Sequence, residues 1–364
     1  MSWSIKLFTL GGTAVRMHLT FLLLVAWIAV IEWQHGSPQD AARGVLFILV
    51  LFACVVLHEF GHIWAARRYG IRTPDVTLLP IGGVASMERM PEKPTQEIAV
   101  ALAGPAVNAA IAFVILLVLR LDASQLSFGA VQGSFLAQIA AANLVLLIFN
   151  LIPAFPMDGG RVLRGILAIW LGFGRATQVA ARIGQGLAIV LAAVGLMGNP
   201  LLVLIAIFIF AAAGGEARYV KLRELARGRA VTDAMIAPTE GLSVMATAED
   251  AAALLARSAQ RVVPVIDGAG HLRGVVLREK ALGAVKQNRG ATPVLELMAS
   301  HVPTIPQSAG LETAIPLLFA SRARCIGVVD DVGRFVGYLT PESIGERLAV
   351  RLGPEKRSSG WLRG

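Results

Sequence analysis

Long apolar runs dominate the first 217 residues of the chain. Because each run approaches the ~20 residues that a bilayer span requires, they predict a polytopic α-helical membrane domain with about six transmembrane helices. The runs occupy residues 18–33, 44–66, 98–119, 135–151, 183–197 and 201–213. Between the second and third runs, Val76 to Met87 predicts a short β segment. It would serve either as a strand edge for an extended peptide or as a plain interfacial hairpin or loop.

The pattern changes from residue 229 onward to short β-rich and helical segments that occur twice. Runs such as Val262 to Ile266 and Ile326 to Val329 each end in an acidic turn, a glycine and a second β-rich run. Equivalent residues are separated by 63 positions, as in the pairs Met235 and Met298, Asp267 and Asp330, Gly270 and Gly333, and Gly274 and Gly337. The spacing predicts a soluble α/β domain that arose by tandem duplication.

Charge is distributed unevenly between these two parts. The whole chain is 55% hydrophobic and 16% charged, with a mean hydropathy of +0.67. Residues 1–217 contain 13 Lys or Arg and 10 Asp or Glu, whereas residues 218–364 contain 20 and 14. This division excludes a secreted, disulfide-stapled or wholly cytosolic protein. The two cysteines, Cys54 and Cys325, fall on opposite sides of it, so we expect both to be reduced.

Loop charges predict the orientation of the membrane domain, because Lys and Arg gather on the cytoplasmic side. With the amino terminus inside, the outer segments contain only Arg43 and Arg120. The inner segments contain Lys6, Arg16, Arg67, Arg68, Arg72, Arg89, Lys93, Arg161, Arg164, Arg175 and Arg182. We therefore expect a multi-pass protein of the inner membrane with both termini in the cytoplasm. The net charge of +9 then reflects topology and contact with the lipid bilayer, and we expect no nucleic-acid partner.

The second apolar run ends in His58, Glu59, Phe60, Gly61 and His62. On a helix, positions i and i+4 share one face, so the two imidazoles can bind one metal ion while Glu59 lies beside them as a base for a metal-bound water. Three ionisable groups at the end of an apolar span are expensive to bury without a function. The alternative is a group of interfacial polar residues near the cytoplasmic end of the helix.

A third metal ligand is available where the fourth apolar run is interrupted. The segment Asn150 to Gly160 contains two prolines and two glycines, which predict a break in the helix. Irregular backbone at membrane depth is tolerated where protein or a water-filled cavity satisfies it. We therefore expect Asp158 on a loop that turns inward toward the histidines. An ordinary turn with a solvated aspartate is the alternative.

Together these motifs resemble the site-2 protease family of intramembrane zinc metalloproteases. The resemblance rests on His-Glu-x-x-His and Asn-x-x-Pro-x-x-Pro-x-Asp-Gly-Gly, and it extends to Pro80, Gly82, Gly83, Gly104, Pro105 and Asn108. It implies one Zn²⁺ per chain with His58, His62 and Asp158 as ligands. It also implies that Glu59 is the catalytic acid and base, and that Asn150 polarises the scissile carbonyl or holds the substrate strand.

The duplicated region resembles a pair of cystathionine-β-synthase (CBS) modules, which implies a regulatory or dimerising role and a homodimer. Such modules often bind adenosine ligands through Gly-x-x-Thr-x-x-Asp. Here Leu277 and Lys280 replace the Thr and Asp in the first module, and Ser343 replaces the Asp in the second, although Thr340 is kept. These departures argue against an adenine nucleotide. The expected divisions are a membrane domain at 1–217, a basic linker at 218–230, modules at 231–288 and 289–350, and a disordered tail at 351–364.

The combined features predict an intramembrane zinc endopeptidase that cuts a transmembrane segment of a client protein near the cytoplasmic side. We expect this client to be a regulatory protein. One alternative is a CBS-regulated membrane transporter, which predicts polar pathways without a hydrolytic set of residues. Another is a non-proteolytic membrane scaffold that binds metal. The presence of His58, Glu59, His62 and Asp158 in one chain favours the protease over both.

Overall fold

The computed structural model describes residues 3–351 apart from 81, 89, 90, 92, 121–133, 238, 239, 259 and 322. The chain divides into two compact units, Met1–Ala217 and Arg218–Gly364, which we call the membrane unit and the repeat unit. The residues expected to form a disordered tail lie, from 352 onward, outside the described part. The fold of each unit is treated separately below.

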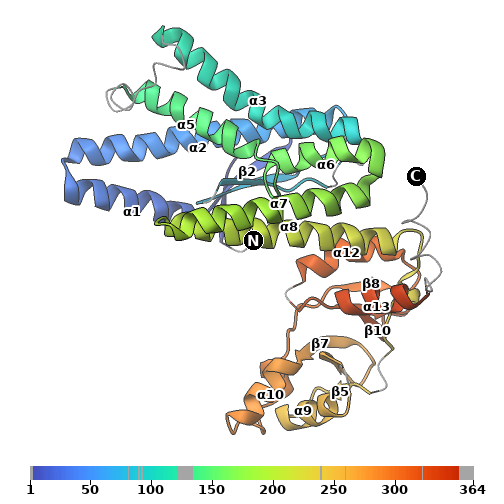
Figure 1. Ribbon diagram of the computed structural model, residues 1–364. Coiled ribbons are helices and arrows are strands. Elements are labelled where there is room, and N and C mark those ends of the chain that lie inside the picture. The colour runs from blue at the N-terminus through green and yellow to red at the C-terminus, as the bar shows by residue number, and fades with distance from the viewer. Residues whose placement is uncertain are drawn as a thin grey trace. The chain divides into compact units, whose positions relative to one another are not determined.

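Helices make up most of the membrane unit (Figure 1). They are α1 (Leu19–His35), α2 (Pro38–Arg67), α3 (Pro94–Leu119), α5 (Phe135–Asn150), α6 (Asp158–Leu171), α7 (Phe173–Leu196) and α8 (Pro200–Ala226). Of the described helices, α2, α3, α7 and α8 are long and apolar enough to cross a membrane, and α1 and α5 are shorter apolar helices. The polytopic helical class is thus confirmed, whereas the number of six spans stays a prediction.

The helix α2 presents the histidine motif, and its ends follow from its sequence. Ser37 and Asp40 form a capping box at the start, where Pro38 occupies the first turn. Arg67 lies in the last turn, where a cation interacts favourably with the helix dipole. The helix packs on α3, and His58 and His62 are both buried. The apolar residues of α2 therefore support a polar face that points into the protein.

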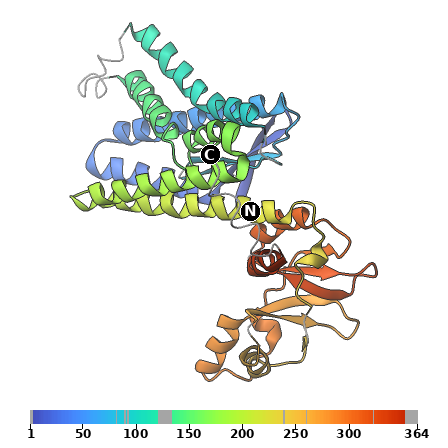
Figure 2. The same ribbon diagram turned by 45° about the vertical axis from the view of Figure 1, so that its right-hand side comes forward.

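A four-stranded sheet accompanies the helices of the membrane unit. Its strands are β1 (Ser4–Leu10), β2 (Thr13–His18), β3 (Asp75–Leu79) and β4 (Gly82–Ala85), hydrogen-bonded in the order β1-β2-β3-β4. The pairs β1–β2 and β3–β4 are antiparallel, and β2–β3 is parallel. In Figure 2 the blue strands lie together at one side of the helices. The β segment between α2 and α3 is confirmed, whereas the two amino-terminal strands were not predicted.

The helix α6 corrects the expectation that Asp158 lies on a loop. Asp158 is the first residue of the helix, and Gly159 and Gly160 belong to its first turn. A Cβ atom on Gly159 would collide with the carbonyl oxygens of Leu151 and Ile152. Local sequence rules treat two adjacent glycines as a helix break. Here the two glycines instead allow the first turn of α6 to pack closely against the preceding turn.

The repeat unit contains the expected duplication. The first half holds β5 (Leu242–Ser243), α9 (Ala248–Ala256), β6 (Val262–Ile266), β7 (Leu272–Leu277) and α10 (Arg278–Lys286). After α11 (Val294–Leu297), the second half holds β8 (Thr304–Pro306), α12 (Leu311–Ala320), β9 (Ile326–Val329), β10 (Phe335–Leu339) and α13 (Pro341–Arg351). The sheets have the orders β5-β6-β7 and β10-β9-β8. The soluble α/β class is confirmed.

Each half of the repeat unit receives a short segment from the other. Backbone bridges join Ile236 to Tyr338 and Val275 to Ala299, again with a 63-residue offset. Gly337 and Gly274 receive the side chains of the two equivalent methionines, Met235 and Met298. The segment around residue 235 therefore packs on the second half, and the segment around 298 packs on the first.

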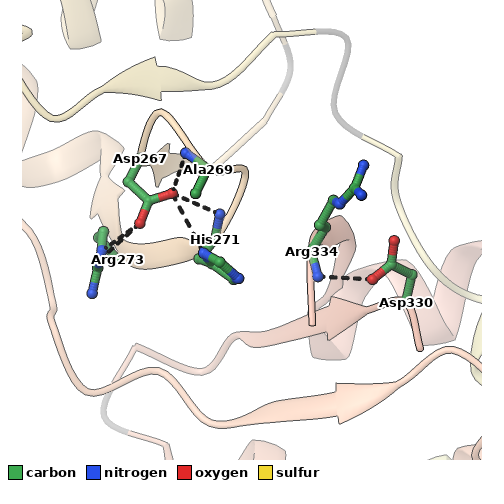
Figure 3. Close-up of polar contacts among 6 residues, drawn as sticks. All are labelled: Asp267, Ala269, His271, Arg273, Asp330 and Arg334. Atoms are coloured by element: carbon green, nitrogen blue, oxygen red, sulfur yellow. Dashed lines mark hydrogen bonds and ion pairs between the residues drawn. The ribbon is translucent and has the colours of Figure 1, made fainter. Parts of the chain in front are cut away.

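The acidic turns of the two halves use the same hydrogen bonds (Figure 3). The backbone N–H groups of Ala269 and His271 each donate to Asp267 Oδ1 at 2.9 Å. In the second half, the N–H group of Arg334 donates to Asp330 Oδ1 at 2.8 Å. An aspartate that accepts from backbone amides further along is a turn-forming residue. The repeated aspartates therefore shape hairpins rather than a ligand site.

Candidate metal centre

Three side chains that the sequence singled out converge inside the membrane unit. His58 and His62 come from one face of α2, and Asp158 comes from the start of α6. The Nε2 atoms of the histidines lie 3.1 Å apart, and each lies 3.2 Å from Asp158 Oδ2. All three residues are buried. The structure thus gathers, from segments about 100 residues apart in sequence, a set that could hold a metal ion.

The shape of this triangle fits tetrahedral zinc. Zinc binds imidazole nitrogen and carboxylate oxygen at about 2.0–2.2 Å, so neighbouring tetrahedral ligand atoms lie about 3.3 Å apart, close to the distances seen here. The facing helix α3 makes space for the two imidazoles by having a glycine at position 104. A Cβ atom there would collide with His62 Nε2 and would lie 2.7 Å from His58 Nε2. Two neutral imidazoles and one carboxylate are a ligand set that zinc sites use, with a fourth position left for water.

The helix α3 orients both imidazoles through their other ring nitrogens. His62 Nδ1 lies 2.7 Å from the carbonyl oxygen of Val100, and His58 Nδ1 lies 3.2 Å from Asn108 Oδ1. Since a carbonyl oxygen accepts, Nδ1 of each ring carries the hydrogen and the Nε2 lone pair is free for a metal ion. Val100, Gly104 and Asn108 follow one another at intervals of four residues, so they lie on one face of α3.

No sequence pattern assigns a role to Val100 or to Asn108 beyond the place of Asn108 in the family pattern. The backbone carbonyl of Val100 leaves no signal in the sequence. A buried asparagine in the middle of an apolar helix was the available clue, because such a side chain requires a partner.

Glu59 lies on α2 between the two histidines in sequence and is half-buried. It is not part of the triangle. A Cβ atom on Gly83 of β4 would lie 2.8 Å from Glu59 Cγ and 3.1 Å from Oε1, so the strand passes directly over this side chain. The Glu59 side chain therefore lies against β4, the end strand of the described sheet.

Asn150 is the last residue of α5 and is half-buried. Among the described residues its side chain makes no hydrogen bond to the triangle or to Glu59. The structure thus brings His58, His62 and Asp158 together, with Glu59 next to His58 along α2. Asn150 lies at the end of α5, eight residues before Asp158 along the chain.

A cleft of about 550 Å³ lies between the halves of the repeat unit. Its lining includes Arg261, Leu277, Arg278, Glu279, Arg324, Thr340 and Glu342. The Arg278 guanidinium donates to three backbone carbonyls within residues 255–260. The N–H of Thr340 donates to Ser343 Oγ at 3.1 Å, and the N–H of Ser343 donates to Thr340 Oγ1 at 3.2 Å. The polar groups expected to meet an adenosine ligand are thus partly engaged within the protein. The expectation from the sequence, which argues against an adenine nucleotide, stays a prediction.

Comparison with protein families finds two matches. The model of peptidase family M50 matches residues 46–127 and 123–193. The model of the CBS domain matches residues 231–287 and 294–349. The first match contains the whole triangle of His58, His62 and Asp158, and the second covers both halves of the repeat unit.

Individual proteins agree with the family models. A zinc metalloprotease of Methanocaldococcus jannaschii is 39% identical over 237 residues, which cover 65% of this chain and 67% of the relative. A predicted zinc metalloprotease of Synechocystis sp. is 31% identical over 373 residues, covering 94% of this chain and 95% of the relative. Among solved structures, a site-2 protease from Methanocaldococcus jannaschii is 37% identical, covers 59% of this chain and 95% of its own, and has a TM-score of 0.44.

Proposed function

The chain belongs to peptidase family M50, and from this membership we propose that it is a zinc metalloprotease that cleaves a transmembrane segment of a client membrane protein near the cytoplasmic side. The observation that carries the proposal is the buried triangle of His58, His62 and Asp158, with Glu59 next to His58 on the same helix. No nucleic acid or redox partner is required by this chemistry. Peptide hydrolysis needs only water, an electrophilic centre and a proton carrier.

His58, His62 and Asp158 would hold one zinc ion. Zinc in such a site supplies Lewis acidity and lowers the pKa of a bound water to about 7. Glu59 acts as the general base that accepts a proton from the attacking water, and it then returns this proton to the leaving amide nitrogen. Its place beside the ligands, rather than among them, suits this exchange.

Asn150 provides a neutral donor for the substrate. Its amide is half-buried and has no hydrogen-bond partner among the site residues described above, so it can donate to the oxyanion or to the substrate backbone. In enzymes that stabilise an oxyanion, loss of one such donor lowers kcat by about 10²-fold or more.

The substrate would bind as an extended strand along β4. A transmembrane helix hides its amide bonds in its own hydrogen bonds, so it must unwind before it can be cut. β4 is the end strand of the described sheet and passes over Glu59, so a peptide added to it would present its backbone at the base. A proline scan of residues 82–85 should lower cleavage while zinc remains bound, and unchanged cleavage at every position would exclude this binding mode.

The main test is cleavage in a reconstituted bilayer. The purified full chain is incorporated in liposomes with a single-span model substrate, and wild type is compared with Glu59→Gln. We expect the variant to lose activity by about 10²–10⁴-fold and to keep one zinc per chain. Glu224→Gln, at an exposed glutamate of α8, is the matched control. Equal cleavage by wild type and Glu59→Gln, or less than one zinc per purified wild-type chain, would refute the proposal.

The same preparation tests the remaining site residues. His58→Ala and Asp158→Ala should lower the zinc content, whereas Asn150→Ala should keep the zinc and lose cleavage by about 10²-fold. Unchanged zinc in either ligand variant removes that residue from the ligand set. This distinction separates a protease from a scaffold that only binds metal.

We further propose that the protein is a multi-pass protein of the cytoplasmic membrane with both termini inside, and that the CBS pair makes it a homodimer. The excess of Lys and Arg on the inner segments supports the orientation. A fluorescent protein that matures only in the cytoplasm, fused at the carboxy terminus, should fluoresce. A fusion that does not fluoresce would contradict the proposed orientation. A monomeric mass in native mass spectrometry would exclude the dimer.

A further inference from the structure

Arg164 is a charged residue that the proposed chemistry does not use, yet it is only 1% exposed. It lies on α6, the helix that begins with Asp158. Its Nε and Nη2 atoms lie 2.6 Å and 2.5 Å from Glu97 Oε1 of α3, and its Nη1 donates to Glu216 Oε1 of α8 at 2.6 Å. A buried charge is costly unless it is paired, so the position of this guanidinium is tightly determined.

Two aromatic rings enclose the same guanidinium. Its central carbon lies 5.1 Å from the centroid of Phe155 and 4.7 Å from that of Phe173. Phe155 belongs to the turn that leads into Asp158, and Phe173 begins α7. A planar guanidinium can stack on rings and bind carboxylates at once, which an ammonium group cannot do. Arg164 therefore fixes the turn before Asp158 as well as the helix after it.

Glu97 connects this cluster to the other half of the metal centre. It lies three residues before Val100, whose carbonyl oxygen orients His62, so both are on neighbouring turns of α3. Beside the ion pair, a Cβ atom on Gly165 would lie 2.6 Å from Ile98 Cγ1, which shows how closely α6 approaches α3. The pair thus joins the helix that supplies the third ligand to the helix that orients the imidazoles.

We propose that Arg164, paired with Glu97 and stacked on Phe155, is a positioning residue that holds Asp158 at the distance at which it closes the metal site. Within the described residues, the Arg164–Glu97 pair is the only ion pair that joins α6, the helix of Asp158, to α3. A shift of α6 along α3 would move the carboxylate away from the two Nε2 atoms without changing any ligand. This inference rests on the proposed zinc site but concerns how the site is held, and not the reaction.

The test measures metal binding by the purified full chain in detergent, without substrate. Apo protein is titrated with Co²⁺, whose visible absorption reports ligand number and geometry, and then with Zn²⁺ in competition. Arg164→Lys keeps the charge and loses the planar fork, and Glu97→Gln keeps the shape and loses the charge. We expect each to weaken metal binding by about 10-fold or more and to change the Co²⁺ spectrum. Arg182→Lys, at an exposed arginine of α7, should match wild type.

A variant that simply destabilises the fold is recognised by its size-exclusion profile and circular dichroism. Should Arg164→Lys or Glu97→Gln fail to fold, a third variant is used. Phe155→Leu leaves every charge in place and removes only the stacked ring. We expect it to bind Co²⁺ more weakly than wild type with an altered spectrum. Wild-type affinity and an unchanged spectrum in the folded variants would overturn the proposal for Arg164 alone. A wild-type chain that binds neither Co²⁺ nor Zn²⁺ would overturn the zinc site and this inference together.

Discussion

The two units bury different kinds of side chains. In the membrane unit, His58, His62, Glu97, Asp158 and Arg164 are all less than 9% exposed. In the described part of the repeat unit no Lys, Arg, His, Asp or Glu is buried, and the buried polar residues are hydroxyls: Ser321, Thr340 and Ser343. Buried charge is costly unless it is paired, and in the first unit these residues pair in two groups, the triangle and the Arg164–Glu97 ion pair. The described part of the second unit has apolar cores, and its charged side chains lie at exposed or half-buried positions, as in the Asp267 turn.

The largest effect is expected from a single methyl group at the metal centre. Gly104→Ala would push a Cβ atom into His62 Nε2, so the imidazoles must move and zinc affinity should fall by about 100-fold. The matched control is Gly186→Ala in α7, where a Cβ atom meets nothing within 4 Å. It should leave zinc binding unchanged and stabilise the helix by up to about 1 kcal/mol. Competitive zinc titration measures both, and wild-type affinity in Gly104→Ala would contradict the packing described here.

An intermediate effect is expected in the core of the repeat unit. Leu318 of α12 is fully buried, whereas its neighbour Leu317 is 38% exposed. Leu318→Ala should lower the free energy of unfolding of this unit by about 2–5 kcal/mol, and Leu317→Ala by about 0.5 kcal/mol. Hydrogen exchange of the full chain in detergent should show lost protection in residues 311–339. The zinc content should not change, and its loss in Leu318→Ala would show that the two units do not act independently.

The smallest effect is expected at an exposed turn. The N–H of His271 lowers the pKa of Asp267 most, aided by the N–H of Ala269 and by Arg273. The folded-state pKa is therefore below the unfolded value of about 3.9, so the carboxylate stabilises the fold above that pH and the benefit is lost as the pH falls through the folded pKa. The unfolding free energies of wild type and Asp267→Asn, measured in urea, should differ at pH 7 and approach each other as the pH falls below about 4. A difference independent of pH would mean that the charge contributes nothing.

Local patterns predicted the parts of the site that lie within one helix. His58 and His62 are four residues apart, and helical geometry alone places them on one face. The Pro- and Gly-rich interruption of the fourth apolar run predicted that Asp158 turns inward, but nothing in the local sequence shows which elements bring it to the histidines of α2. Its helix was missed because Gly159 and Gly160 are interpreted locally as breakers, whereas tertiary packing uses them for close approach.

Arg164 illustrates what local sequence cannot supply. In the sequence it is one more positive charge of a predicted inner segment, like any arginine beside an apolar run. Its partners lie 67 and 52 residues away in sequence, and no spacing rule connects them. The two amino-terminal strands were missed for a similar reason, since β2 pairs with β3, which follows two intervening helices.

The exchange of segments between the halves of the repeat unit bears on how such a duplication persists. Each half carries the residues that cover its sister: Met235 covers Gly337, and Met298 covers Gly274. Deleting one copy would strip the other of its cover and leave strand edges and apolar surface open to water. After the duplication, neither copy could be lost alone without harming the survivor. We therefore expect the two halves to fold as one cooperative unit, although the sequence displays two copies.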